Sequence, residues 1–292
     1  MIYTFKRTNQ IYVKFANRLG NNIFQLSAAL YLKKTLFKND ATIILSDKRL
    51  NNLFNLKGFK YPNIIEKIII HLFFRYKILT LGFEKYLLGQ KLPPLDSLSK
   101  FNKILLQGLF INQNYMHPIK DDLSNLLLFS NESLRSGNTL TIHIRCKESD
   151  TQSNLPDNPD YPMLPFSFYE KIISSEKWDE IFVVAAKDKD PFVQKLKIKY
   201  NAKVISQNPL NDFLFLMQSS NIVLSVSTFA WTAAYLSSAK KVFYPRTGMF
   251  LNKSPLREDL ELKEDKRFRI FDVSTPNPWT ASTKQIEEML NS

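Results

Sequence analysis

Three short segments of the sequence hold polar and charged side chains in spacings that suit a phosphorylated ligand. The first is Arg18-Leu-Gly20-Asn21, which combines a fixed positive charge, a glycine that lets a ligand approach the backbone, and an amide donor. A helix that begins here would direct its free N–H groups and the positive end of its dipole toward an anion. An ordinary turn between a strand and a helix would hold the same residues, so this segment does not decide the function by itself.

The second segment is His143-Ile144-Arg145, at the end of a strand-like apolar run. Alternation along a strand puts His143 and Arg145 on the same side. A guanidinium at the end of a parallel strand can bind a diphosphate through two parallel hydrogen bonds. The alternatives are a core histidine bonded to the backbone, and an arginine in a surface ion pair with Glu148 or Asp150.

The third segment is Ser225-Val-Ser227-Thr228-Phe229-Ala-Trp231, where a strand gives way to a helix. Hydroxyls at such a junction cap the helix, and they can also bind a phosphate oxygen. Simple capping by Ser227 or Thr228 is the alternative, and different hydroxyls could do both. We expect Phe229 and Trp231 to pack in the core.

Alternating strands and helices position these segments. The pattern predicts a strand at 11–15, a buried helix from 23 to about 34 and a strand at 42–45, which is a βαβ unit of a parallel sheet. From residue 139 the alternation becomes regular, and solid apolar runs indicate strands covered on both faces. The predicted strands there are 139–144, 181–185, 203–205, 222–225 and 241–244, and the predicted helices are 166–175, 191–200, 210–219, 228–236 and 283–290.

This pattern favours two α/β units, each a doubly wound sheet that binds ligands beyond the carboxyl ends of its strands. We place an N-terminal domain at residues 1–136, a C-terminal domain at 137–279 and a final helix at 280–292. The Pro- and Asp-rich segment 149–165 is expected to form an acceptor-side loop.

Composition narrows the class of protein. The chain has 292 residues, of which 44% are hydrophobic, so it can form a core and is not disordered. One cysteine excludes a disulfide framework and a Cys-based zinc site, and three widely spaced histidines make no metal centre. No metal is therefore expected.

The formal net charge of +13 favours anionic partners. Residues 57–120 hold ten of the Lys and Arg residues against three acids, mixed with aromatic residues. We expect amphipathic helices with solvated basic faces there, and a surface for an anionic membrane is the alternative. The N-terminus has no signal-peptide pattern, and no apolar run reaches the roughly 20 residues of a transmembrane helix. A cytoplasmic protein, free or peripheral at the inner face of the membrane, is expected.

The three segments together resemble one family. Asn17-Arg-Leu-Gly-Asn-Asn-Ile-Phe-Gln25 resembles the opening Gly-x-Leu-Gly-Asn-Gln-x-Phe-Gln of the bacterial α-1,2-fucosyltransferases, glycosyltransferase family 11, and of the related protein O-fucosyltransferases. His143-Ile-Arg145 is similar to the family's His-x-Arg-Arg-Gly-Asp. Ser225-Val-Ser-Thr-Phe-Ala-Trp-Thr-Ala-Ala-Tyr-Leu236 is similar to its Asn-Ser-Ser-Phe-Ser-Trp-Trp-Ala-Ala-Trp-Leu.

The resemblance implies a GT-B fold, with two Rossmann-like domains facing a central cleft. It implies an inverting, metal-independent transfer of fucose from GDP-fucose to a glycan hydroxyl, a galactoside in α-1,2 linkage, in the synthesis of surface polysaccharide such as lipopolysaccharide. Arg145 would be catalytic, because it would stabilise charge growing on the diphosphate leaving group. The donor-binding residues that the resemblance implies are Arg18, Gly20, Asn21, His143, Arg145, Asp188, Ser225, Ser227 and Thr228.

The sequence departs from the family's pattern at three places. Asn17 replaces the first glycine of the opening pattern. Cys146 stands where the second arginine is expected, and Lys147-Glu148 replaces Gly-Asp. After the strand at 181–185, Ala186-Lys-Asp188 replaces Ser-Asp-Asp, in which an acidic group helps to read the nucleotide.

An inverting transfer also benefits from a carboxylate or a histidine that takes the proton of the acceptor. The loop carboxylates that could face the cleft are Asp47, Glu148, Asp150, Asp157 and Asp160. Of these, Glu148 and Asp150 are the candidates for the base, and a solvated loop carboxylate is the alternative for each.

Three alternatives remain from the sequence. One is a GT-B enzyme with another nucleotide-sugar donor. Another is a polyanion-binding or nucleic-acid-binding protein, although no known nucleic-acid motif is present and no such partner is expected. The third is a sugar- or nucleotide-binding protein that has lost catalysis.

Overall fold

The structure is a computed structural model that describes residues 9–15, 18–64, 67, 85–89, 92–128, 135–145, 160–251 and 260–292. The chain divides into two compact units. Unit 1 comprises Met1–Phe129 and Ser254–Glu258, and unit 2 comprises Ser130–Lys253 and Asp259–Ser292. The domain boundary expected from the sequence follows residue 136.

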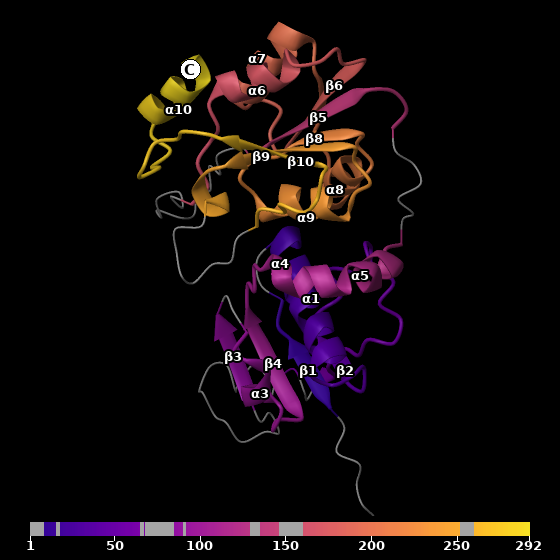
Figure 1. Ribbon diagram of the computed structural model, residues 1–292. Helices are drawn as coiled ribbons and strands as arrows, with labels where there is room; N and C mark the ends of the chain where they lie inside the picture. The colour runs from indigo at the N-terminus through magenta and orange to yellow at the C-terminus, as the bar shows by residue number, and fades with distance from the viewer. Residues whose placement is uncertain are drawn as a thin grey trace, which may run out of the picture. The chain divides into compact units, whose positions relative to one another are not determined.

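Unit 1 is built on a parallel sheet. Within its described residues the sheet has four strands in the order β2-β1-β4-β3 (Figure 1). The strands are β1 (Gln10–Val13), β2 (Thr42–Leu45), β3 (Lys85–Gly89) and β4 (Lys103–Gly108). Ile11 of β1 lies beside Ile43 of β2 and Ile104 of β4, so the centre of the sheet is apolar. Helix α1 (Leu19–Thr35) connects β1 to β2 and buries Phe24 and Leu26 completely.

The prediction of basic amphipathic helices across residues 57–120 is wrong for much of the segment. Two strands, β3 and β4, lie there, followed by the short helices α4 (Gln113–Met116) and η1 (His117–Ile119). Ile104, Leu105 and Leu106 are fully buried, because β4 lies between two other strands of the sheet. The strand was not predicted because its apolar run is short and lies in a segment rich in lysine. Part of the segment 57–120 lies outside the described residues.

Two further helices of unit 1 are α3 (Leu95–Leu98) and α5 (Lys120–Leu126). The amide nitrogen of Gln25, on α1, donates to the carbonyl oxygens of Lys14 at 3.2 Å and Gly108 at 2.5 Å. Gln25 is 1% exposed. Since Lys14 follows β1 and Gly108 ends β4, this side chain joins the carboxyl ends of the two central strands.

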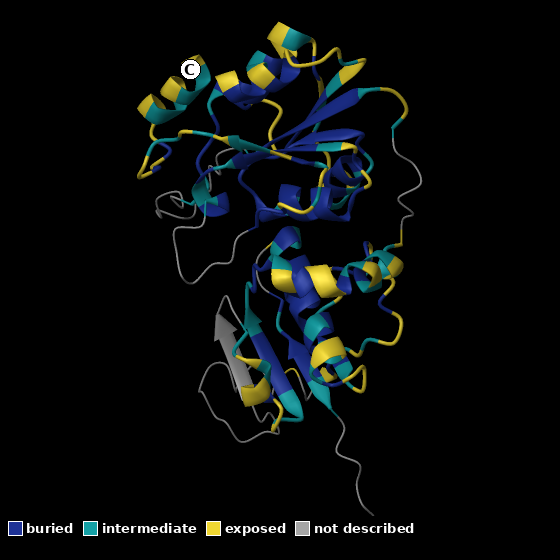
Figure 2. Ribbon diagram, viewed as in Figure 1, coloured by how far each residue is buried: buried dark blue, intermediate teal, exposed yellow. Residues whose placement is uncertain are grey.

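Unit 2 contains a larger parallel sheet. In the part of unit 2 that the structure describes, six strands lie in the order β10-β9-β8-β5-β6-β7. They are β5 (Thr139–Ile144), β6 (Glu180–Ala185), β7 (Lys203–Ile205), β8 (Asn221–Val223), β9 (Lys241–Arg246) and β10 (Phe268–Asp272). Every residue of β5 is buried, as a strand covered on both faces requires (Figure 2).

Helices cover both faces of this sheet. The helices α6 (Phe166–Ile173), α7 (Pro191–Tyr200) and α10 (Thr283–Asn291) lie on one face, and α8 (Pro209–Met217) and α9 (Thr228–Leu236) lie on the other (Figure 1). A short helix, η2 (Gly248–Phe250), follows β9. The outermost strand β7 is only three residues long, and its Lys203 pairs with Glu180 of β6.

Local chemistry sets the helix ends. Asp190 accepts a hydrogen bond from the Phe192 amide at 3.0 Å, and Pro191 occupies the first turn of α7. Asn201, with a φ of 50°, ends α7 in the left-handed conformation. These signals place α7 where the sequence predicts it. Strand β10 was not predicted, because Phe268-Arg-Ile-Phe-Asp alternates and follows a charged stretch.

We expect that replacing Gln25 with leucine lowers the free energy of unfolding by about 1–3 kcal/mol, because two part-buried carbonyl groups lose the donor that a fully buried side chain supplies. Urea unfolding of the variant measures this change. The control is Gln194→Ala, which removes an exposed amide hydrogen bond and should cost less than about 0.5 kcal/mol. A loss in the leucine variant no larger than in the control would contradict the bridging role of Gln25.

Candidate active site

The order of strands in unit 2 reverses between β5 and β8. The chain runs from β5 outward through β6 to β7, and then returns to β8 on the other side of β5 before continuing to β9. Ligands of open α/β sheets bind beyond the carboxyl ends of the strands at such a point. His143 and Arg145 come from the end of β5, and Ser225 and Ser227 follow β8.

The side chains of His143 and Ser225 meet at this point. The Nδ1 atom of His143 lies 2.6 Å from the Ser225 hydroxyl oxygen, and the two side chains are 7% and 4% exposed. The His143 ring also lies 5.5 Å from the ring of Phe229, on α9. His143 is therefore bonded to a side chain of the neighbouring strand loop, and the alternative of a histidine bonded only to the backbone is wrong.

His143 is uncharged at neutral pH. Burial, together with the positive charge of Arg145, lowers the pKa of His143 to about 3. A neutral imidazole can donate or accept a hydrogen bond but brings no charge to a ligand. Of the two side chains that follow from β5 on this side, Arg145 is thus the one that could bind an anion by charge.

Arg145 lies directly after β5, and its guanidinium carbon is 4.1 Å from the centre of the Tyr161 ring. The sequence predicts that Arg145 and His143 share a side of the strand, and the effect of Arg145 on the pKa of His143 agrees with this placement. The expected loop that holds Tyr161 is described only from residue 160 onward.

Helix α9 begins where the loop after β8 ends. Its cap is Ser227, whose hydroxyl accepts from the Phe229 amide at 3.2 Å. Thr228 is the first helical residue and is 8% exposed. Trp231 is fully buried, stacks on Tyr235 and donates to the Leu260 carbonyl at 2.8 Å. Capping by Ser227 and core packing of Trp231 are confirmed, whereas Phe229 is half-buried and lies between the rings of His143 and Phe213.

Asp188 lies in a different part of unit 2. Its carbonyl and carboxylate oxygens accept from the Gln194 side chain at 2.8 and 3.3 Å. It lines a hollow of about 520 Å³ between α7 and β7, together with residues that include Lys197 and Ser206. That hollow includes none of the residues at the β5–β8 junction. The structure thus groups His143, Arg145, Ser225 and Ser227, with Asp188 in a separate hollow.

The remaining predicted residues fall elsewhere. Arg18, Gly20 and Asn21 belong to unit 1, where Arg18 precedes the first turn of α1 and supplies no side-chain cap. Glu148 and Asp150, the candidate bases, lie outside the described residues, as does Cys146.

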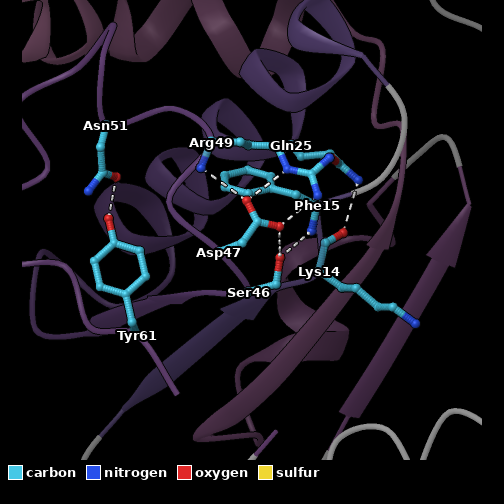
Figure 3. Close-up of polar contacts among 8 residues, drawn as sticks. All are labelled: Lys14, Phe15, Gln25, Ser46, Asp47, Arg49, Asn51 and Tyr61. Carbon is cyan, nitrogen blue, oxygen red and sulfur yellow. Dashed lines mark hydrogen bonds and ion pairs between the residues drawn. The ribbon is translucent and has the colours of Figure 1, made fainter. Parts of the chain in front are cut away.

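A polar cluster at the carboxyl end of β2 in unit 1 holds Asp47, one of the loop carboxylates considered from the sequence, but the cluster around it was not predicted. Arg49 donates to both carboxylate oxygens of Asp47 at 2.7 Å, and the Ser46 hydroxyl bridges Asp47 to the Phe15 amide (Figure 3). Burial would raise the pKa of Asp47, but hydrogen bonds and charge from Arg49, with a bond from Ser46, hold it below its usual value. Asp47 is thus an ionised, fully engaged carboxylate, which suits a fixed binding group better than a proton acceptor.

Sequence analysis also missed two residues of unit 2. Arg246 ends β9 and binds Asp272 through two hydrogen bonds of 2.7 Å. Tyr161 supports Arg145, as described above. A basic residue at the end of a predicted strand is the signal that could have identified Arg246.

Two searches of the described residues bear on cofactors and membranes. Across these residues, no group of three or more His, Cys, Asp and Glu side chains could hold a metal ion. None of the helices that the structure describes is both long and apolar enough to span a bilayer.

The sequence comparison decides the family resemblance. Residues 170–249 match the family described as Glycosyl transferase family 11. The match covers about a quarter of the chain. The matched segment includes the junction of β8 and α9, whereas His143, Arg145 and the start of α1 lie outside it. The match supports a glycosyltransferase of the fucosyltransferase-like kind. No curated protein matched the chain.

Solved structures agree on the fold. The structure of Arabidopsis thaliana FUT1 in complex with GDP is 12% identical, covers 83% of this chain and 72% of that chain, and gives a TM-score of 0.51. The fucosyltransferase NodZ from Bradyrhizobium is 12% identical and covers 80% of this chain and 94% of that chain, with a TM-score of 0.48. The E. coli heptosyltransferase WaaC with ADP is 8% identical and covers 96% of each chain, with a TM-score of 0.48. The predicted α/β fold of the GT-B type, with parallel sheets, is confirmed.

The low pKa of His143 predicts how stability depends on pH. Below about pH 6.5 the unfolded chain takes up a proton on this histidine, whereas the folded protein does so only near pH 3. The stabilisation by neutral His143 is therefore complete above pH 6.5 and is lost as the pH falls from 6.5 toward 3. Between pH 7.5 and 5.5 this loss amounts to about 1 kcal/mol.

The test compares wild type with His143→Asn by urea unfolding at both pH values. The variant should lose about 1 kcal/mol less than wild type on acidification. His117→Asn is the control, because His117 is exposed, and it should keep the wild-type dependence. An unchanged dependence in His143→Asn would rule out a buried neutral histidine at this position.

Proposed function

We propose that the protein transfers fucose from GDP-fucose to a glycan hydroxyl with inversion and without a metal. The observation that carries the proposal is the grouping of Arg145, Ser225, Ser227 and the amino end of α9 at the point where the strand order of unit 2 reverses. The family 11 match across 170–249 and the GDP bound by the similar FUT1 structure support a nucleotide-sugar donor.

The proposed reaction develops negative charge on a diphosphate. The acceptor oxygen bonds to the anomeric carbon, the bond from that carbon to the β-phosphate oxygen breaks, and the electron pair leaves with GDP. Arg145 is proposed to stabilise this charge, together with the N–H groups at the start of α9 and the hydroxyl of Thr228. Glu148 or Asp150 is proposed to take the acceptor proton.

The chemistry of the other predicted residues suggests which part of the nucleotide sugar each would contact. Neutral His143 is proposed to hold Ser225 in place beside the nucleotide, and Asp188 to contact the base. Arg18, Gly20 and Asn21 of unit 1 are proposed to contact the diphosphate or the sugar through a guanidinium, an open backbone and an amide. A different donor base is the second candidate, because Cys146 and Ala186 depart from the family's pattern.

A thermal-shift screen with GDP, UDP, CMP and their sugars tests the donor. GDP and GDP-fucose should raise the melting temperature of wild type, because a ligand that binds only the folded state stabilises it. A rise in melting temperature with UDP or CMP compounds alone would show that the donor is not GDP-fucose.

Arg145→Ala should lose most of the rise in melting temperature that GDP causes, and should lose about 100-fold or more of the turnover, measured as transfer to a galactoside.

The control for Arg145→Ala is Arg269→Ala, an exposed arginine on β10. It should keep the shift and the turnover. Equal losses in both variants would show that the role assigned to Arg145 is wrong.

The acceptor is proposed to be a galactoside of a surface polysaccharide, joined in α-1,2 linkage, and the enzyme to work at the inner face of a membrane. The excess of basic residues in 57–120 supports contact with anionic lipid. In flotation assays the protein should bind vesicles that contain phosphatidylglycerol and should ignore neutral phosphatidylcholine vesicles, with binding weakened by salt. Equal flotation with both vesicles, or with neither, would remove the proposed membrane contact.

A further inference from the structure

An aromatic ring supports the guanidinium that is proposed to bind the diphosphate. The Arg145 guanidinium carbon lies over the Tyr161 ring, 4.1 Å from its centre. A ring attracts a cation through its face, so this contact does not consume the N–H donors in the guanidinium plane. The Tyr161 contact thus orients the guanidinium through its face.

The position of Tyr161 is fixed by the turn after β9. The Asp160 carbonyl accepts from the Met249 amide at 2.7 Å. Gly248 has a φ of +53°, and a Cβ atom there would lie 2.5 Å from Pro162 Cδ and 2.6 Å from the Asp160 oxygen. Both neighbours of Tyr161 therefore lie against Gly248, at a distance that only glycine permits.

The turn itself is held in place. The Tyr244 hydroxyl donates to the Phe250 carbonyl at 3.2 Å, and the two rings stack with centres 4.7 Å apart. The Thr247 and Thr275 hydroxyls lie 2.7 Å apart. Since Tyr244 belongs to β9, the turn is attached to the sheet.

Residues 160–162 therefore contact two parts of unit 2: the Tyr161 ring contacts Arg145, which follows β5, and Asp160 and Pro162 lie against Gly248, which follows β9. These contacts with Arg145 on one side and Gly248 on the other connect the candidate catalytic group to a rigid part of the sheet.

We propose that Tyr161 is a positioning residue, which holds the Arg145 guanidinium over its ring so that the N–H edge is directed at the diphosphate. Gly248 and Met249 set the place of Tyr161. The proposal rests on the proposed function, because it requires that Arg145 binds the diphosphate of the donor.

Substitutions of Tyr161 test the role of the ring. Tyr161→Leu and Tyr161→Gln both remove the aromatic face, and each should lower kcat/KM for transfer from GDP-fucose by roughly tenfold, with most of the loss in kcat. The glutamine variant covers the case in which the leucine variant does not fold. Tyr161→Phe keeps the face and should restore kcat/KM to within about twofold of wild type. Tyr200→Leu, which removes a ring beside Lys199 on α7, is the matched control and should leave turnover unchanged.

A double-mutant cycle separates positioning from a general structural role. In an Arg145→Ala background, Tyr161→Leu should cause no further loss, because the group through which it acts is gone. The same tenfold loss in both backgrounds, or full turnover in Tyr161→Leu, overturns the proposal while the proposed function stands. A wild type that is not stabilised by any nucleotide or nucleotide sugar overturns both.

Discussion

The hydrogen bond between His143 and Ser225 is the interaction on which the rest of the candidate site depends. It joins two strand ends that are 82 residues apart in sequence and adjacent in the sheet. Because parallel strands are connected by long crossovers, their ends are aligned only by contacts across the sheet. This bond at 2.6 Å fixes the start of the loop from which Ser227 and α9 follow, relative to the strand from which Arg145 follows.

The two basic side chains near this bond differ in charge because their surroundings differ. His143 is buried and neutral, while Arg145 stays cationic beside a partly exposed aromatic ring. Burial is the main cause that lowers the pKa of His143, and the positive charge of Arg145 adds to it, so the two neighbours differ in charge. The arrangement presents one positive group where a protonated histidine would have added a second.

The sequence predicts the second unit better than the first. The strand at 139–144 and the helices at 191–200 and 228–236 match the structure to the residue, because solid apolar runs, a proline after an acidic cap and a serine cap mark them clearly. Strand β4 was missed because its apolar run is short and lies among lysines, so charge outweighed hydrophobic pattern.

Part of the candidate site was predictable because the strands that carry it were predicted. Polar residues at predicted strand ends identify His143, Arg145 and Ser225 as members of one edge of the sheet. The pairing of His143 with Ser225 depends on β8 lying beside β5, and strand order cannot be derived from the sequence of each strand. Tyr161 could not be found either, because its contact with Arg145 depends on a tight backbone approach at Gly248.

The short outer strand of unit 2 has a consequence for behaviour at high concentration. Among the described residues, strand β7 lies at the edge of the sheet, and the backbone groups on the outer side of an edge strand can recruit a strand from another molecule. Its three residues give few bonding positions, and the Lys203 ammonium, bound to Glu180, would lose hydration if a second strand docked beside it. This edge therefore resists fibril-like stacking of the protein.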